Sequence, residues 1–278
     1  MTSWITSLLV LAAGLAPAFA QVSPVVVGAV ISQTGIQASL AQDYRKALLL
    51  WQDEINAAGG LLGRPVELRL LDDGSEAVRA GALYGELIRD KADLLIGPFG
   101  SAATLLALAQ AERSRRVLVN GAGPARAVHR RSPKYLVQVI APYSAYATGI
   151  LELARAAGCR QLFISVRDDP ASNEMADGAR RLALAQGFSV NIPESYPGGT
   201  KDFAPLVGKA RLSGAPLWIS FCAARDVVEI VLTSRKDNYS PKVFFTNAAT
   251  LPNFIPLAGR DAELSLGVVE YDARLATK

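Results

Sequence analysis

A regular alternation of two kinds of segment constrains the fold of this chain more than any other feature. From Val25 onward, short aliphatic and β-branched runs alternate with longer runs in which apolar residues recur with a helical period. This pattern predicts parallel sheets with right-handed crossovers and helices on both faces. The expected strands are 25–31, 66–71, 93–96, 116–119, 135–139, 161–166, 188–192, 217–221, 242–246 and 266–269. The expected helices are 39–58, 76–91, 102–114, 145–157, 173–186, 202–212 and 224–236.

Two such α/β units follow one another, separated near Ala141-Pro142-Tyr143. The sequence therefore predicts an α/β protein with two doubly wound parallel-sheet lobes. The first lobe is expected at 21–141 and the second at 142–246.

The first twenty residues are predicted to be a secretory signal peptide. They carry no charged side chain, and an apolar run ends at Pro17 and a small-residue Ala18-Phe19-Ala20 site. This is the pattern of a cleavable signal, and cleavage is expected after Ala20. A membrane anchor is the alternative, but an anchor needs roughly 20 apolar residues and no small-residue exit.

Composition and charge exclude several classes of protein. Half of the residues are apolar and 19% are charged, which is typical of a globular protein. The densest basic run, 126–134, has no interleaved aromatic residue before Tyr135, so a solvated loop is favoured over a nucleic-acid site. Two cysteines, Cys159 and Cys222, are too few for a disulfide scaffold and are expected to be buried free thiols.

The loop after the third expected strand reads GPFGSAAT, over 97–104, and a helix is expected to begin at Ala102. Ser101 is then predicted to be the N-cap of that helix. The first-turn N–H groups and the positive end of the helix dipole favour an anion at this position. Two roles for Ser101 fit this pattern: a contact to a ligand carboxylate, or a capping role without a ligand.

Three segments resemble one family. The segments 54–68 (EINAAGGLLGRPVEL), 97–104 and 199–206 (GTKDFAPL) are similar to the branched-chain amino-acid ABC-transporter substrate-binding proteins, which are type I periplasmic binding proteins like the leucine-binding protein. The resemblance extends over about 25–271. It implies a periplasmic protein in which crossing strands join two lobes and the ligand lies between them.

The resemblance also implies how the chain connects the lobes. Crossings are expected near 140–143 and 246–250, so that the tail, 247–278, would return to complete the first lobe. Members of the family usually run on for several dozen residues, and the chain is therefore expected to be truncated at its C-terminus, with an unpaired sheet edge.

Site residues in the first lobe follow from the resemblance. Ser101 and Ala102 would contact a ligand carboxylate, and Ala122 and Gly123 would let it approach backbone amides. Pro124 stands where a threonine is usual, which removes one hydroxyl and one N–H. Thr34 and Gln37, in the first loop, are further expected polar contacts.

The second lobe departs from the amino-acid-binding pattern. Ala171 and Ser172 stand where an aromatic residue and glycine are usual, and Asn247 and Ala248 stand where an acid would face the ligand's ammonium. No Asp or Glu lies between positions 237 and 261, and a buried ammonium without a counter-charge costs several kcal/mol. Two further residues, Phe221 and Cys222, would add apolar contacts. An organic or aromatic acid is therefore expected in preference to an amino acid.

Enzyme signals are absent from the sequence. The single histidine, His129, has no G-x-S-x-G elbow beside it, and C-x-x-C, H-E-x-x-H and phosphate-loop motifs do not occur. No cofactor or metal is therefore expected. Asp72-Asp73 imitates the acid of a dinucleotide fold, but without the glycine fingerprint it indicates a helix-capping turn.

The sequence thus predicts a periplasmic solute-binding protein, expected to be monomeric, that delivers a small carboxylate to an ABC permease and binds no nucleic acid. Four alternatives stay open: a ligand-sensing receptor or regulator subunit on the same fold, a branched-chain amino-acid binder, a cryptic α/β enzyme, and a degenerate remnant unable to close.

Overall fold

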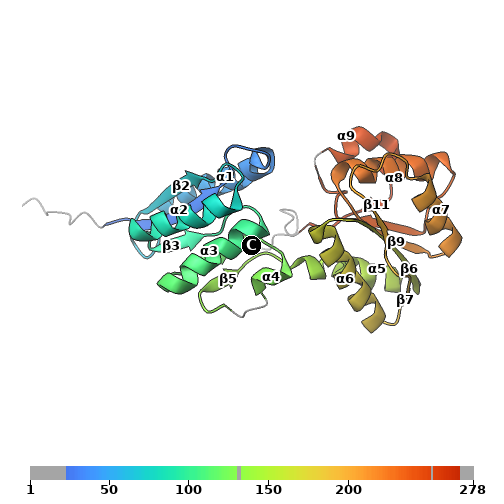
Figure 1. The fold of residues 1–278 in the computed structure, drawn as a ribbon, viewed down its shortest axis with the longest axis horizontal. Helices are drawn as coiled ribbons and strands as arrows, with labels where there is room; N and C mark the ends of the chain where they lie inside the picture. Colours follow the sequence, from blue (N-terminus) through green and yellow to red (C-terminus); the bar gives the residue numbers. More distant parts are fainter. Residues whose placement is uncertain (1–22, 130–132, 252, 270–278) are drawn as a thin grey trace, which may run out of the picture.

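A computed structural model describes residues 23–129, 133–251 and 253–269. The predicted signal peptide and its cleavage site lie outside the described residues. Within them, no helix is long and apolar enough to cross a membrane. The chain forms two α/β units (Figure 1), one in blue to green and one in yellow to red.

The first unit is built on a parallel sheet with the strand order β2-β1-β3-β4-β5. Its strands are β1 Val25–Ile31, β2 Val66–Asp72, β3 Leu94–Ile96, β4 Leu118–Asn120 and β5 Leu136–Gln138. Its helices are α1 Ala38–Ala57, α2 Ala77–Arg89, α3 Ser101–Ser114 and α4 Arg126–His129. The basic run predicted to be a loop therefore begins as a short helix, and Val128 of that helix is buried in the core of the first unit.

The second unit is built on a parallel sheet ordered β11-β10-β9-β6-β7, with β8 pairing with β6. Its strands are β6 Gln161–Arg167, β7 Ser189–Val190, β8 Glu194–Tyr196, β9 Leu217–Phe221, β10 Val243–Thr246 and β11 Ser265–Leu266. Its helices are η1 Tyr143–Ala145, α5 Thr148–Ala156, α6 Pro170–Ala185, α7 Ala204–Ser213, α8 Ala224–Lys236, α9 Phe254–Ala258 and η2 Gly259–Ala262.

The described part of the tail corrects one prediction. Residues 253–269 do not return to the first sheet but stay with the second unit. Phe254 and Ala258 of α9 are buried in its core, and β11 pairs with β10 through Phe244↔Ser265 and Phe245↔Leu266. The burial of these two α9 residues holds the segment beside α8. Residues 270–278 lie outside the described residues.

The two sheets are covered to different extents. Apolar clusters occupy both faces of the second sheet. On the first sheet α2 and α3 cover one face, whereas α1 covers only part of the other. An apolar hollow of about 370 Å³ remains there, lined by residues that include Trp51, Ile96, Val119 and Val139.

The link between the units is tight and polar. The Glu174 side chain of α6 accepts a hydrogen bond from the Arg126 N–H of α4, at 2.7 Å. Beside it, α6 lies directly against η1 at Gly178: a Cβ on this glycine would be 2.4 Å from the Ser144 Cα atom. The Glu174 hydrogen bond joins the two units, and the contact at Gly178 packs α6 against η1 within the second unit.

The close approach at Gly178 predicts that a Cβ at this position destabilises the fold. Gly178→Ala should lower the free energy of unfolding by about 1–3 kcal/mol, because the backbone of η1 must shift. Gly208→Ala in α7 is the matched control, since a Cβ there meets no atom within 4 Å and should stabilise by about 0.4–1 kcal/mol. Urea unfolding of both variants measures the difference, and equal stability would contradict this packing.

Candidate ligand-binding site

Helix α3 begins where the loop after β3 turns away from the sheet. Gly100 is its N-cap and adopts a φ of 94°, which side chains disfavour. Ser101 is the first helical residue, so its prediction as the N-cap is wrong. Its Oγ instead accepts a hydrogen bond from the Ala125 N–H at 3.0 Å, which leaves the hydroxyl hydrogen for another acceptor.

The first turn of α3 opens into a hollow of about 190 Å³, lined among others by Ser32, Gln37, Asp73, Phe99 and Ala102. Within the described residues, no backbone acceptor outside the helix bonds the N–H groups of Ala102 and Ala103. Ser32 is almost fully buried, and its hydroxyl has no hydrogen-bond partner in the described structure. Donors without partners at a helix N-terminus favour an anion.

In the loop after β4, a side chain of the loop itself accepts hydrogen bonds from the backbone N–H groups. The Asn120 side-chain oxygen accepts from the Gly123 N–H at 2.9 Å and from the Ala122 N–H at 3.3 Å. Gly123 is also packed against Thr104, where a Cβ would lie 2.3 Å from the hydroxyl oxygen. These two N–H groups could meet a ligand only by leaving Asn120.

A second hollow, of about 360 Å³, adjoins the first and shares Phe99 with it. The first unit contributes Leu40, Tyr44, Gly121, Ala122 and Pro124, and the linking segment contributes Ile140, Tyr143 and Tyr146. Of the predicted first-lobe residues, Ser101, Ala102 and Gln37 therefore line the first hollow and Ala122 the second. Thr34 and Gly123 line neither.

Thr34 lines neither of these two hollows and instead makes hydrogen bonds that hold the first loop. Its hydroxyl donates to Asp72 Oδ2 at 2.7 Å, while Asp72 Oδ1 accepts from the N–H groups of Gln33, Thr34 and Gly74. Although partial burial opposes them, these bonds lower the pKa of Asp72 from its ordinary value of 3.8 to about 2. Asp72 thus fixes the first loop beside the hollow that Gln37 lines.

The predicted residues of the second unit line none of the hollows of about 370, 190 and 360 Å³. Phe221, Cys222 and Ala248 are buried, and burial raises the pKa of the Cys222 thiol to about 11. Asn247 bonds the backbone of Cys222 through both ends of its carboxamide. Ala171 follows Pro170 at the start of α6, and Ser172 bonds Asp169, the N-cap of that helix. Both cysteines are free and buried, as the sequence predicts.

A charged cluster that the sequence did not predict lies at the carboxyl ends of β6 and β9 in the second sheet. Arg167 Nε lies 3.7 Å from Asp169 Oδ2 and 4.0 Å from Asp226 Oδ2. The Tyr196 hydroxyl donates to Asp226 at 3.3 Å, and burial raises its pKa. Asp226 lies outside the segment 237–261, in which the resemblance places an acid that faces the ligand. Its place in the first turn of α8 was the available signal.

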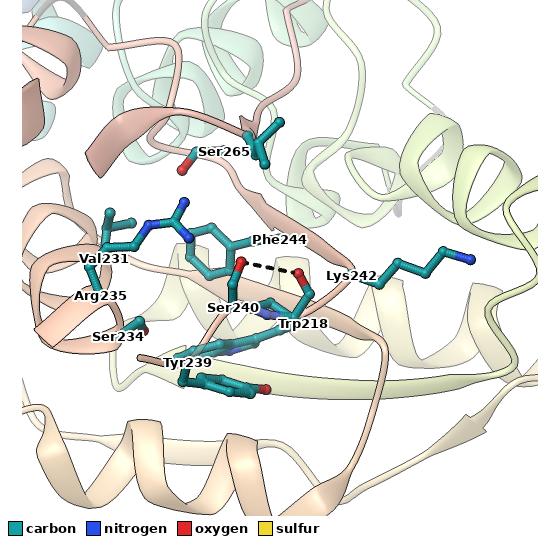
Figure 2. A pocket seen from close by; sticks show the side chains of 11 residues that line it. Trp218, Val231, Ser234, Arg235, Tyr239, Ser240, Lys242, Phe244 and Ser265 are labelled. Atoms are coloured by element: carbon teal, nitrogen blue, oxygen red, sulfur yellow. Dashed lines mark hydrogen bonds between the residues drawn. The ribbon is translucent and has the colours of Figure 1, made fainter. Parts of the chain in front are cut away.

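Figure 2 shows a separate hollow at the opposite ends of β9 and β10, with Trp218, Phe244, Tyr239 and Arg235 around it. Its volume of about 40 Å³ is far smaller than those of the hollows beside the first sheet. Ligands of open α/β sheets bind at the carboxyl ends of the strands, so this hollow is not the candidate site. No group of three or more potential metal ligands occurs in the described residues.

The family model for periplasmic binding proteins matches residues 24–278. This chain belongs to that family. A relative from Pseudomonas aeruginosa, named an amino acid binding protein, is 28% identical over 204 residues, covering 69% of this chain and 52% of the relative. The chain therefore spans about half the length of this curated relative.

Solved structures of periplasmic binding proteins share the fold. A leucine-, isoleucine-, valine-, threonine- and alanine-binding protein from Brucella ovis has a TM-score of 0.77 at 18% identity, over 86% of this chain and 64% of that one. A leucine-binding protein from Thermotoga maritima has a TM-score of 0.70 at 19% identity, over 91% and 72%. A Rhodopseudomonas palustris solute-binding protein in complex with 4-hydroxybenzoate has a TM-score of 0.67 at 18% identity, over 85% and 66%. The chain thus has the type I periplasmic binding fold.

The Asp72 network predicts a pH dependence. A carboxyl whose pKa is lower in the folded protein contributes stability above its unfolded pKa, and this contribution is lost as the pH falls through the folded value. The wild type should therefore lose this contribution between about pH 4 and pH 2, and Asp72→Asn should lack that component of the decline. Unfolding measured at several acidic pH values tests this, and parallel curves for both proteins would contradict it.

Proposed function

We propose that this periplasmic binding protein is an extracytoplasmic solute-binding protein that binds a small carboxylate and delivers it to a membrane ABC permease. An organic or aromatic acid without an amine is the proposed ligand class. The protein acts by binding, with no catalytic step, cofactor or metal, and works as a monomer in the periplasm. The family match supports transport, and the first turn of α3 supports the carboxylate.

The observation that supports a carboxylate ligand is the position of the Ser101 hydroxyl at the first turn of α3. The Ser101 hydroxyl is fixed by the Ala125 N–H, so its hydrogen can point to a ligand oxygen without a search through rotamers. The unpartnered N–H groups of the same turn lie beside it, and the dipole of a 14-residue helix adds its positive end. A charge-assisted hydrogen bond there contributes about 1.5–3 kcal/mol.

The charges of the second unit support a ligand without an amine. Asp226 is buried and already shared between Arg167 and Tyr196. Neither Asn247 nor Ala248 carries a charge. An ammonium placed beside them would be desolvated without a counter-charge.

An amino acid is the second candidate, and one observation favours it. Asp73 is 1% exposed and lines the hollow at α3, and only its Oδ1 has a described partner, the Ser75 N–H at 2.8 Å. Its other oxygen could accept a hydrogen bond from an ammonium group. A sensing receptor on the same fold is the alternative to transport, and neighbouring permease and ATPase genes would distinguish the two.

We also propose that the units act as two lobes that meet near 141–142 and close on the ligand by a hinge motion. Closure would bring the second-unit candidates, among them Ala171, Asn247 and Phe221, toward the hollows of the first unit. Scattering measurements with and without ligand would test this movement.

Calorimetry of matched ligand pairs tests the ligand class. Each acid without an amine should bind at least tenfold more tightly than the amino acid with the same side chain, because the uncompensated ammonium costs more than about 1.4 kcal/mol. Leucine as the tightest ligand found would contradict the proposal. In that case Asp73→Asn should abolish leucine binding if Asp73 is the counter-charge.

Substitution of Ser101 tests the contact itself. Ser101→Ala removes the hydroxyl donor, so affinity for the best carboxylate should fall about ten- to a hundredfold. It also removes the acceptor of the Ala125 N–H and should cost about 1 kcal/mol of stability. Ser114→Ala, at the exposed far end of α3, is the control. Unchanged affinity in folded Ser101→Ala protein would leave Ser101 with a structural role alone.

A further inference from the structure

Four of the nine residues that line the hollow of about 360 Å³ are aromatic, and the others are aliphatic or glycine. Phe99 and Tyr44 come from the first unit, and Tyr143 and Tyr146 come from η1 and the residue after it. No charged side chain lines this hollow. A ligand part placed there would be uncharged and largely apolar.

The aromatic walls are anchored in different cores. Phe99 packs on the cluster that contains Ile31 and Ala41, whereas Tyr143 and Tyr146 pack on the core of the second unit. The two tyrosine rings meet edge to face, with centroids 5.5 Å apart at 75°. The Tyr44 hydroxyl donates to the Gly97 carbonyl at 3.0 Å, which fixes its ring. Aromatic rings from both units therefore line the hollow.

Phe99 is the one lining residue that the two hollows have in common. This side chain lines both, and the Ala125 N–H that holds Ser101 follows Pro124, which lines the aromatic hollow. A ligand with its carboxylate at the first turn of α3 would extend past Phe99 into the aromatic hollow. Aromatic rings prefer offset or edge-to-face contacts with other rings, which favour an aromatic occupant over an aliphatic one of equal size.

We infer that the ligand of this protein carries a single aromatic ring, and that Phe99 and Tyr146 bind that ring while the first turn of α3 binds its carboxylate. This inference rests on the proposed function and narrows its ligand class. Phe99 and Tyr146 are then the residues that determine specificity. Because they belong to different units, the ring also contributes to holding the two units together.

The test compares benzoate with cyclohexanecarboxylate, which has a similar size and no π system. Benzoate should bind about two- to tenfold more tightly to the wild type. Phe99→Leu and Tyr146→Leu should each remove that preference, whereas Tyr146→Phe, which keeps the ring, should retain it. Tyr135→Leu lies outside the hollow and is the control for a general loss of aromatic residues.

Thermal unfolding establishes that each variant is folded before titration by calorimetry. Equal affinity for the two acids in the wild type, or a preference that survives both leucine substitutions, would overturn the inference. If an aliphatic acid binds in a Ser101-dependent way while benzoate does not, the ring is excluded and the proposed function stands. If no carboxylate binds at all, the proposed function fails as well.

Discussion

The turn at Gly100 is the constraint on which the candidate site depends. Its N–H donates to the Ala122 carbonyl, and its own carbonyl accepts from both the N–H and the hydroxyl of Thr104. The loops after β3 and β4 are thereby joined at the point where α3 begins. Because the φ of Gly100 is positive, a side chain there would strain this junction and shift the first turn that supplies the donors.

Two side chains accept hydrogen bonds from backbone N–H groups in the loops around the site. Asn120 occupies the N–H groups of its own loop, and Asp72 occupies those of the first loop. Each bond removes one donor that a ligand could have used. Donors without a described partner remain at the first turn of α3, where Ser32, Ser101, Ala102 and Ala103 line one hollow.

Hydrophobic periodicity was enough to predict the strands and helices that form the centre of each sheet. The expected bounds of the β1 and β9 strands and of the α8 helix agree with the structure, because long segments with one buried face carry a strong periodic signal. Among the missed segments, α4, β8 and α9 have four, three and five residues, too few to show a period. A strand was expected at 266–269, and the structure has the two-residue strand β11 at Ser265–Leu266. Because β11 pairs with β10, the tail stays with the second sheet and does not return to the first.

The candidate site was less predictable because its contacts join distant residues. Ser101 was recognised as polar at a helix start, but its bond to Ala125 depends on how two loops meet. The occupation of the Ala122 and Gly123 amides by Asn120, and the grouping of Arg167 with Asp226, likewise depend on tertiary structure. Phe99 lines one hollow with Tyr143 and Tyr146 although it lies more than 40 positions before them in the sequence, and no local pattern predicts that contact.

The central claim is that a carboxylate, and not merely an apolar ligand, is held at the first turn of α3. The most direct measurement is the affinity of the best acid found compared with that of its primary amide, which has the same shape and no charge. The account predicts that the acid binds at least tenfold more tightly to the wild type and that Ser101→Ala reduces this difference. Equal affinity for the acid and its amide would contradict it.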